Sequence, residues 1–216
     1  VGEPPAQKGD RAARRDLSRD HNHRIAPDDV LVPGGNATRA KANLAAVRLL
    51  KELEAQKRLP TPQERKVLAQ FSGWGSLAEE VFKADFENLA NRYGGEVPAS
   101  ERNRYHQPFL EKYDAWRRRY GELHPNIGGL FSKEEWDAAK RSTLNAHYTD
   151  RDVVTAMWDM VRQLGFTGGQ VVEPAAGIGH FFGLMPENLA AASHLKGVEL
   201  DSVTGRLLDK LYPAAD

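Results

Sequence analysis

The segment QVVEPAAGIGHF, residues 170–181, constrains the fold of this 216-residue chain more than any other part of it. Two valines lead into an acidic residue, a proline, two alanines and a Gly-x-Gly. This order is typical of a buried parallel strand that ends in a tight turn, with a helix starting behind the turn. Glycines let the backbone adopt positive φ and approach a ligand closely. Because doubly wound α/β folds bind nucleotides at such units, the segment predicts an α/β fold with a ligand site at the turn.

The residues around the turn indicate which ligand fits. A dinucleotide fingerprint needs a third glycine where this chain has Phe182. Glu173 at the strand end would repel a pyrophosphate, but it suits a ligand with ammonium and sulfonium charges, such as S-adenosylmethionine. A second short strand, KGVELD at 196–201, carries Glu199 about twenty residues past Gly179, the spacing at which an acidic residue meets ribose hydroxyls. We therefore predict a site for S-adenosylmethionine.

Composition excludes several classes of protein. The chain has no cysteine, which excludes disulfides, thiolate metal sites and cysteine nucleophiles and predicts a reducing, cytoplasmic location. Lys and Arg total 30, as do Asp and Glu, so any contact with nucleic acid must come from local patches. No apolar run reaches the roughly 18 residues of a transmembrane helix, and the N-terminus lacks a signal-peptide core, so no membrane partner is expected.

Three regions follow from the pattern along the chain. Residues 1–35 are predicted to form a flexible polar tail, 36–140 a helical lead-in region, and 141–216 the α/β region. The run DHNH at 20–23 invites a metal interpretation but lacks the flanking elements of a metal site, so we predict no metal. Arginines of the tail could contact phosphate, but interleaved aspartates favour a solvated tail.

The lead-in region contains clear helix signals. Leu44, Val47, Leu50 and Leu53 recur at helical spacing. Capping boxes are predicted at TPQE, residues 61–64, and at SKEE, residues 132–135. Trp74 lies between two glycines, and we interpret it as a buried side chain that holds a loop rather than as a ligand contact.

Residues 82–128 carry an aromatic stripe beside three arginines. Its members are Phe109, Tyr113, Trp116 and Tyr120, next to residues 117–119. Aromatics and arginines together can stack bases and hold phosphates of single-stranded nucleic acid. An aromatic stripe at helical spacing is more often a packing face, which is the interpretation we favour.

The segment STLNAHYTD, residues 142–150, runs directly into an amphipathic helix. Thr149 with Asp152 is predicted to cap its start, and a helix N-terminus is a ready site for a carboxylate. The predicted inner face of the helix is made of Val153, Val154, Met157, Val161 and Leu164, with Trp158 alongside.

Three motifs together resemble the N6-adenine DNA methyltransferases: NAHYT at 145–149, EPAAGIGHF at 173–181 and GVELD at 197–201. The resemblance is closest to the large methylase–helicase fusions of phages, plasmids and integrative elements, which are mobile genetic elements; some of these fusions are called antirestriction proteins. Their helical lead-in and Gly-Trp-Gly-Gly motif are similar to RAKANLAAVRLLKELE at 39–54 and GWGS at 73–76. The resemblance covers roughly residues 36–80 and 140–213.

The resemblance implies a helical N-terminal region followed by the first part of a Rossmann-like methyltransferase sheet. It also implies that S-adenosylmethionine is the cofactor, with the methionine end against Tyr148 and Thr149 and the adenine against Leu200. The glycine loop would contribute Glu173, Pro174, Ala175, Gly177 and Gly179, and Glu199 would hold the ribose. Asp150 replaces the proline that is common after Tyr-Thr in these methyltransferases, and Ala176 replaces a frequent Cys or Gly. Both departures bear on the affinity for the cofactor more than on the identification of the motifs.

The family's catalytic Asn/Asp-Pro-Pro-Tyr/Phe loop, which binds a flipped-out target base, is not in this sequence. We therefore expect no catalytic residue within the chain and place the loop beyond Asp216. The partners expected are DNA and either a C-terminal part of the same protein or a second chain, because two parallel strands cannot cover their own faces. The alternative is a non-catalytic, methylase-like module that binds DNA or a partner; a third reading is an RNA or protein methyltransferase.

Overall fold

The structure of the protein is a computed structural model that describes residues 21–144 and 148–216. It is a mixed α/β fold, mostly helical, with a small parallel sheet. Its elements are α2 (Asn36–Ala55), α3 (Pro62–Leu68), the 3₁₀ helix η2 (Gly75–Leu77), α4 (Ala78–Val81), α5 (Ala84–Tyr93), α6 (Ala99–Arg102), α7 (Gln107–Tyr120), α8 (Lys133–Ser142), α9 (Arg151–Gln163), β1 (Gln170–Glu173), α10 (His180–Gly183), α11 (Glu187–Ala191), β2 (His194–Gly197) and α12 (Ser202–Leu211). None of the helices in these two ranges is both long enough and apolar enough to cross a membrane.

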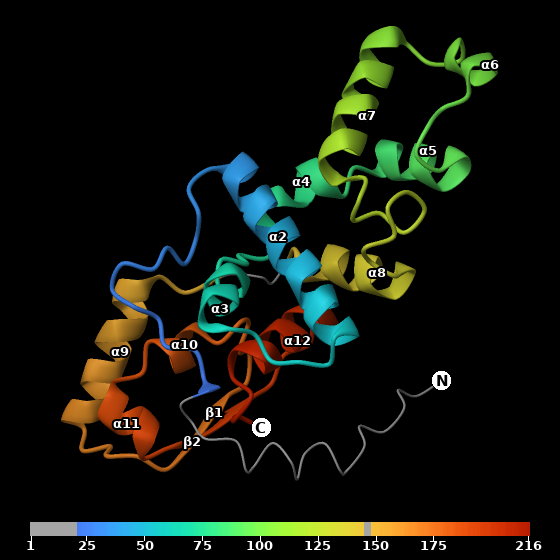
Figure 1. Ribbon diagram of the computed structural model, residues 1–216. Coiled ribbons are helices and arrows are strands. Elements are labelled where there is room, and N and C mark those ends of the chain that lie inside the picture. The colour runs from blue at the N-terminus through green and yellow to red at the C-terminus, as the bar shows by residue number, and fades with distance from the viewer. Residues whose placement is uncertain (1–20, 145–147) are drawn as a thin grey trace.

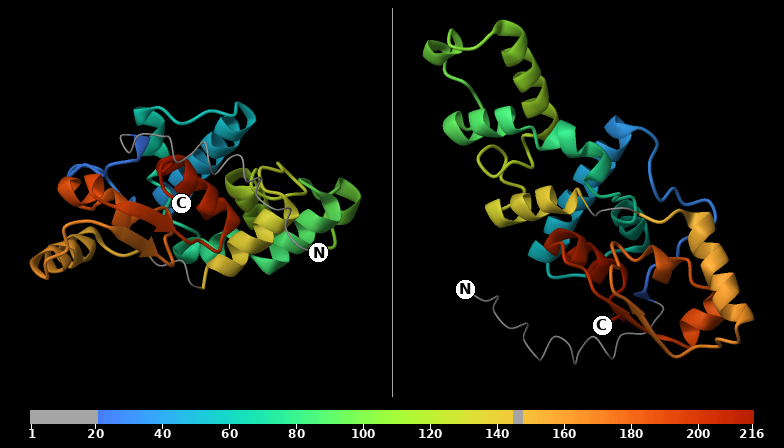
Figure 2. Two further views of the ribbon diagram at one scale, coloured as in Figure 1. Left: turned by 90° about the horizontal axis from the view of Figure 1, so that it is seen from below. Right: turned by 180° about the vertical axis from the view of Figure 1, so that it is seen from behind.

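The helices are arranged around a central group formed by α2, α3 and α12 (Figure 1). Helices α5, α6 and α7 project from one end of this group, and the sheet lies at the other end together with α9, α10 and α11. The view from behind shows the same separation (Figure 2). The ligand site predicted at the turn after β1 therefore lies far from the projecting helices.

Both predicted capping boxes are confirmed. The backbone N–H of Glu64 donates to Thr61 Oγ1 at 3.3 Å, and the N–H of Thr61 donates to the Glu64 carboxylate at 2.7 Å. Ser132 and Glu135 make the same reciprocal pair at 3.2 and 2.7 Å. These bonds satisfy N–H groups that the helix itself leaves unpaired, and so they fix where α3 and α8 begin.

The start of α9 is capped one residue later than predicted. The side chain of Asp150 accepts a hydrogen bond from the N–H of Asp152 at 2.9 Å, so Asp150 and not Thr149 is the N-cap. The prediction of Thr149 was wrong because Thr and Asp are both good caps and the sequence places them side by side. Asp150 thus has a structural role of its own as the cap of this helix.

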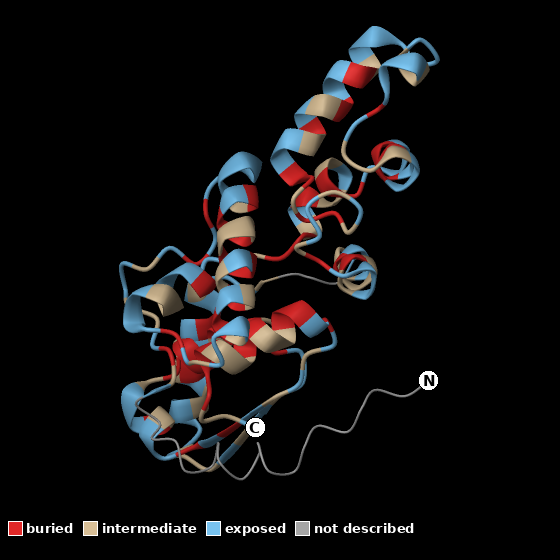
Figure 3. Ribbon diagram, turned by 45° about the vertical axis from the view of Figure 1, so that its right-hand side comes forward, coloured by how far each residue is buried: buried red, intermediate tan, exposed pale blue. Residues whose placement is uncertain are grey.

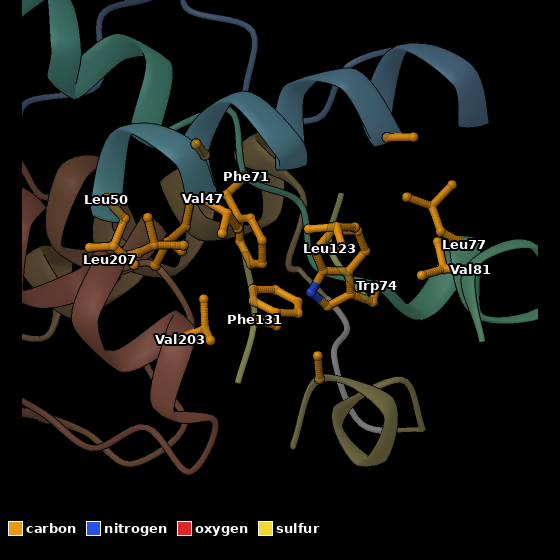
Figure 4. Packing of buried hydrophobic residues seen from close by; sticks show 14 of the residues in the cluster. Val47, Leu50, Phe71, Trp74, Leu77, Val81, Leu123, Phe131, Val203 and Leu207 are labelled. Atoms are coloured by element: carbon orange, nitrogen blue, oxygen red, sulfur yellow. The ribbon is translucent and has the colours of Figure 1, made fainter. Parts of the chain in front are cut away.

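Trp74 is buried, as predicted, and the loop around it is held by Asn43. The amide of Asn43 donates to the carbonyl of Gly73 at 2.6 Å and accepts from the N–H of Ser72 at 2.8 Å. The indole packs edge-on against Phe71 and Phe131 (Figure 4), with ring centroids 5.8 and 6.0 Å away. The lead-in helix and the Gly-Trp-Gly motif therefore form one packed unit, with Asn43 bonded to the carbonyl of Gly73 and to the N–H of Ser72.

The aromatic stripe on α7 is a packing face, which confirms the favoured interpretation. Tyr113, Trp116 and Tyr120 are buried, whereas Arg118 and Arg119 are exposed. The indole N–H of Trp116 donates to the carbonyl of Val81 at 2.9 Å. These rings attach α7 to α4 and α5 and are not available for stacking on bases.

A single hydrophobic cluster joins the helical region to the α/β region. Val203 and Leu207 of α12 pack toward Val47 and Leu50 of α2 (Figure 4). Buried residues lie on the inner sides of the helices and exposed residues on their outer sides (Figure 3). Arg206 of α12 adds ion pairs to Glu54 of α2 and Glu135 of α8.

The two strands pair in parallel, with Gln170 opposite His194 and Glu173 opposite Gly197. On the other edge of β2, the N–H of Asp216 donates to Leu195 O and the N–H of Gly197 donates to Asp216 O, both at 2.9 Å. This pattern is that of a parallel bridge. The backbone of Asp216 therefore lies against β2 on the side opposite β1.

The predicted inner face of α9 is only partly correct. Val154 and Trp158 are buried, and the indole of Trp158 donates to Phe181 O at 2.9 Å. Val153, Met157 and Leu164 are 50, 42 and 81% exposed, so their placement on the inner face was wrong. Apolar residues occupy two sides of this helix, and periodicity alone does not tell which side the neighbouring α10 covers.

Residues 21–35, which belong to the predicted polar tail, lie against the body of the protein; residues 1–20 are outside the described ranges. The N–H of His23 donates to Leu211 O at 2.7 Å and that of Ile25 to Gly183 O at 3.1 Å. The N–H of Ala214 donates to the side chain of Asn22 at 3.0 Å. This strap, residues 22–25, ties the end of α10 to the end of α12.

Candidate functional site

The site is built on the carboxyl ends of β1 and β2. Pairing continues past both strands, because the N–H of Val198 donates to Glu173 O at 2.9 Å and the N–H of Ala176 donates to Val198 O at 3.0 Å. The chain then turns, with the N–H of Gly179 bonded to Ala176 O at 2.8 Å. The predicted glycine loop and the predicted second acidic strand therefore lie side by side, at the end of a parallel sheet where ligands of α/β proteins bind.

Glu199 connects the two halves of the site. Its carboxylate accepts a hydrogen bond from the N–H of Gly177 at 2.8 Å and another from the N–H of Asp201 at 2.9 Å. Each oxygen uses one bond and keeps a further lone pair for another donor. Asp201 in turn caps α12 by accepting from the N–H of Thr204 at 2.9 Å. The acidic side chain is thus fixed in place and retains the capacity to accept from hydroxyl groups.

Both glycines of the loop adopt positive φ and have close neighbours. Gly177, at φ 55°, lies under the ring of Tyr148, and a methyl group added to it would be 3.1 Å from Cε1 of that ring. Gly179, at φ 84°, is the N-cap of α10, and an added methyl group would be 2.3 Å from Tyr212. Only glycine fits the Gly179 position, because both the backbone angle and the neighbouring ring exclude a side chain.

Tyr148 and His180 cover the inner side of the loop, with ring centroids 5.2 Å apart. Burial raises the pKa of Tyr148, and the nearby carboxylates of Glu199 and Asp201 raise it further. Burial lowers the pKa of His180 to about 4, and the positive charge of Arg151 acts in the same direction. At neutral pH both rings are therefore uncharged.

Glu173 lies half-buried at the end of β1. Burial raises the pKa of its carboxyl group, and a hydrogen bond from the backbone of Ala175 acts in the opposite direction. Desolvation of this kind makes a carboxylate favour a cationic neighbour, because a positive charge restores the interaction lost with water. The raised pKa therefore marks Glu173 as a group that a cation would stabilise.

The surface beside the carboxylates is apolar and open. Leu200, directly after Glu199, is 98% exposed, and Pro174 and Ala175 on the facing loop are exposed as well. An almost completely exposed leucine beside a fixed carboxylate gives a planar apolar ring a surface to cover.

The structure places the predicted site residues near one another, but only some of them are in direct contact. Tyr148, Gly177 and Glu199 are in direct contact through the loop. Glu173 joins them through strand pairing, whereas Thr149 is exposed and precedes α9. Residues 145–147 of the NAHYT motif lie outside the described ranges. His180 was missed, although its place directly after the Gly-x-Gly, at the start of a helix, is a signal that sequence reasoning could have used.

No group of three or more acidic or histidine side chains that could hold a metal ion occurs in the described ranges. Comparison of the chain with protein-family models, with curated proteins and with solved structures finds no match.

Proposed function

We propose that this chain is the cofactor-binding N-terminal part of an S-adenosylmethionine-dependent DNA adenine-N6 methyltransferase, fused to a helicase in the full protein. The observation that carries the proposal is the Glu199 carboxylate, fixed at the end of β2 by the N–H of Gly177 at 2.8 Å. An acid in this position is what the ribose of an adenosyl ligand requires. A Rossmann-like sheet is part of the proposal, supported by the parallel order Asp216, β2, β1 and by α12 crossing between β2 and Asp216.

Each residue of the site has a function that its environment suits. Glu199 accepts from the ribose hydroxyls with the lone pairs that Gly177 and Asp201 leave available. Leu200 packs on the adenine ring, which covers its exposed side chain. Glu173, desolvated at the end of β1, holds the ammonium group of the methionine moiety. Tyr148 packs against the loop at Gly177 and keeps water from its inner side.

When bound, S-adenosylmethionine supplies an electrophilic methyl group on a sulfonium. The residues of this chain bind and orient it, and they act on the reaction by fixing position and electrostatics. The neutral imidazole of His180 adds no positive charge of its own against the sulfonium. The Asn/Asp-Pro-Pro-Tyr/Phe loop that would hold the flipped adenine is not in these 216 residues. In the proposal it comes from a following part of the protein or from a second chain.

Calorimetric titration with S-adenosylmethionine tests the site. We expect the wild-type chain to bind, Glu199→Gln to bind at least about tenfold more weakly because a charged acceptor is lost, and Glu96→Gln, at an exposed loop position, to bind like the wild type. Circular dichroism of each variant shows whether it remains folded. Absence of binding by the folded wild-type chain, or equal binding by Glu199→Gln, would overturn the proposed site.

Methyl transfer to DNA separates the proposed enzyme from a non-catalytic module. The full-length protein is incubated with unmethylated duplex and with labelled S-adenosylmethionine, and the methylated base is identified after digestion. N6-methyladenine supports the proposal. Cofactor binding without any transfer favours the methylase-like binding module, and methylation of RNA or of protein instead of DNA assigns the chain to another methyltransferase class.

A further inference from the structure

The short helix α10 carries one end of the glycine loop. Gly179, whose N–H is bonded to Ala176 O at 2.8 Å, is the N-cap of α10, and the helix has only 4 residues. A helix of one turn is not stable by itself, because its few hydrogen bonds do not offset the cost of ordering the backbone. The position of Gly179, and with it the shape of the loop, therefore depends on the contacts that hold α10.

The strap, residues 22–25, supplies such contacts at the far end of α10. The N–H of Ile25 donates to Gly183 O at 3.1 Å, and the guanidinium of Arg24 donates to Met185 O. The strap belongs to the deep-blue segment that passes beside α10 in Figure 1. The carbonyl of Gly183 is one of those that the end of a helix leaves without an internal partner. The strap therefore completes the hydrogen bonding of α10.

Ile25 also packs directly on Gly183. A methyl group added to Gly183 would be 2.5 Å from Cδ1 of Ile25 and 2.5 Å from the hydroxyl oxygen of Tyr212. Two side chains that are far apart in the sequence thus close on the last residue of α10. Because packing of this kind leaves no free volume, the helix has no space to shift toward either side chain.

Tyr212 links this contact to the glycine loop itself. Its ring lies against Gly179 at the start of α10, and its hydroxyl lies against Gly183 at the end. The strap also holds the segment that carries this ring, because the N–H of His23 donates to Leu211 O at 2.7 Å. The strap therefore supports the glycine loop by two routes, directly through α10 and indirectly through Tyr212.

The segment that contains the strap is fixed on both sides to helices of the body. Arg65 of α3 donates to His21 O at 2.7 Å, and Arg151 of α9 donates to Asp29 O at 2.7 Å. Both helices contribute residues to the hydrophobic cluster. The strap is thus attached to the packed body and can transmit its rigidity to the loop.

We propose that Arg24 and Ile25 are positioning residues of the proposed cofactor site, which act on the glycine loop through α10 and Tyr212. This inference rests on the proposed function. With the strap in place, the loop already has the form that binds S-adenosylmethionine, so binding need not order it. Without the strap contacts the cofactor must order the loop, which lowers the affinity. The N-terminal segment thereby controls a site although none of its residues is among those proposed to hold the cofactor.

Hydrogen exchange, measured by NMR on the cofactor-free chain, tests the effect on the loop. We expect the amide of Gly179 to exchange at least about tenfold faster in Ile25→Ala and in Arg24→Gln than in the wild type, because the loop opens locally. The amide of Val198, which is bonded within the strand pairing, should exchange as in the wild type. Val30→Ala, at an exposed position of the same segment, is the matched control and should change neither amide.

Calorimetric titration with S-adenosylmethionine tests the effect on affinity. We expect Ile25→Ala and Arg24→Gln to bind about fivefold more weakly than the wild type, because the cofactor must then order the loop. Asn43→Ala removes buried hydrogen bonds from the loop around Trp74 and is the control for a general loss of stability. At a temperature where circular dichroism shows it folded, it should bind like the wild type.

The proposal is overturned if the folded strap variants bind the cofactor like the wild type, or if Gly179 and Val198 exchange faster by the same factor. It is equally overturned if Asn43→Ala weakens binding as much as the strap variants do, since affinity would then follow overall stability. Absence of binding by the folded wild-type chain would overturn the proposed function and, with it, the effect on affinity. The exchange rate of Gly179 would still show in that case whether the strap holds the loop.

Discussion

The carboxylate of Glu199 accepts a hydrogen bond from the backbone N–H of Gly177 at 2.8 Å, although the two residues belong to different strand–turn units. The bond holds the loop after β1 against the end of β2. A ligand entering the site therefore meets a loop that is already in position, which lowers the ordering cost of binding.

Removal of the Glu199 carboxylate is expected to destabilise the protein. Glu199→Ala leaves the N–H groups of Gly177 and Asp201 without their acceptor, and hydrogen bonds to a charged group contribute about 1.5–3 kcal/mol. Urea unfolding should show this loss in the free energy of unfolding, whereas Glu96→Ala, at an exposed loop position, should stay within about 0.5 kcal/mol of the wild type. Equal stability of the two variants would show that the carboxylate does not hold the loop.

Two glycines with similar φ allow backbone strain to be separated from crowding. Gly165, at φ 91°, has no atom within 4 Å of an added methyl group, whereas Gly179, at φ 84°, would meet Tyr212 at 2.3 Å. We expect Gly165→Ala to cost about 1–2 kcal/mol from the backbone alone, and Gly179→Ala to cost about 1–3 kcal/mol more because the buried ring must move. Thermal unfolding of both variants measures the difference, and equal shifts would contradict the crowding.

Stability should fall as the pH falls below neutral. His23 and His180 titrate at about 4 in the fold against 6.5 for a free imidazole, because burial disfavours the charged ring. The unfolded chain binds protons first, so stability is complete above about pH 6.5 and is lost progressively down to about pH 4. Between pH 7 and pH 5 each histidine should contribute about 2 kcal/mol to the loss.

The His180→Gln variant isolates one of these contributions. Its free energy of unfolding should change less between pH 7 and pH 5 than that of the wild type, by about 2 kcal/mol. The exposed His106 provides the control, since His106→Gln should leave the pH dependence as it is. An unchanged slope in His180→Gln would mean that this ring is not held neutral by the fold.

Asn43 should be more important for stability than its polar nature suggests. Asn43→Ala removes the partners of Gly73 O and of the Ser72 N–H in a buried loop, for which we expect a loss of about 2–4 kcal/mol. Asn36→Ala is the control, because Asn36 is exposed at the start of the same helix. Indole fluorescence provides a second measure, since the ring of Trp74 is fixed by this loop.

The two apolar sides of α9 should respond differently to charge. Val153→Glu places a carboxylate on the exposed side, in the first turn, and is expected to change stability by less than about 0.5 kcal/mol. Val154→Asp buries an unpaired charge against α10 and should cost more than about 3 kcal/mol or prevent folding. Comparable losses in both variants would show that the outer side of α9 is also covered.

Local signals in the sequence predicted much of the fold. The capping boxes at Thr61 and Ser132 and the buried Trp74 follow from short-range chemistry that sequence shows directly. The strand at 170–173 was predicted from its valines, whereas the second strand, predicted at 196–201, lies at 194–197 and pairs with it in parallel. The class of fold, mixed α/β, could therefore be predicted from these local patterns.

Long-range relationships were not accessible in the same way. Which side of α9 is covered depends on where α10 lies, and the choice between Thr149 and Asp150 as cap depends on backbone angles that neighbouring residues set. The contacts of residues 22–25 with Leu211 and Gly183 join segments far apart in the chain, which periodicity does not report. For the same reason the sequence pointed to Glu199 as a ribose ligand but not to its bond with Gly177.

The shared packing of α2 and α12 has a consequence for how the chain can be divided. Val203 and Leu207 find their apolar neighbours in the lead-in helix, so a peptide of residues 141–216 would expose that side of α12 to water. Such a fragment is expected to be poorly soluble and incompletely folded. The helices of the lead-in region and the α/β region that follows them are thus a single folding unit, and neither is expected to fold fully without the other.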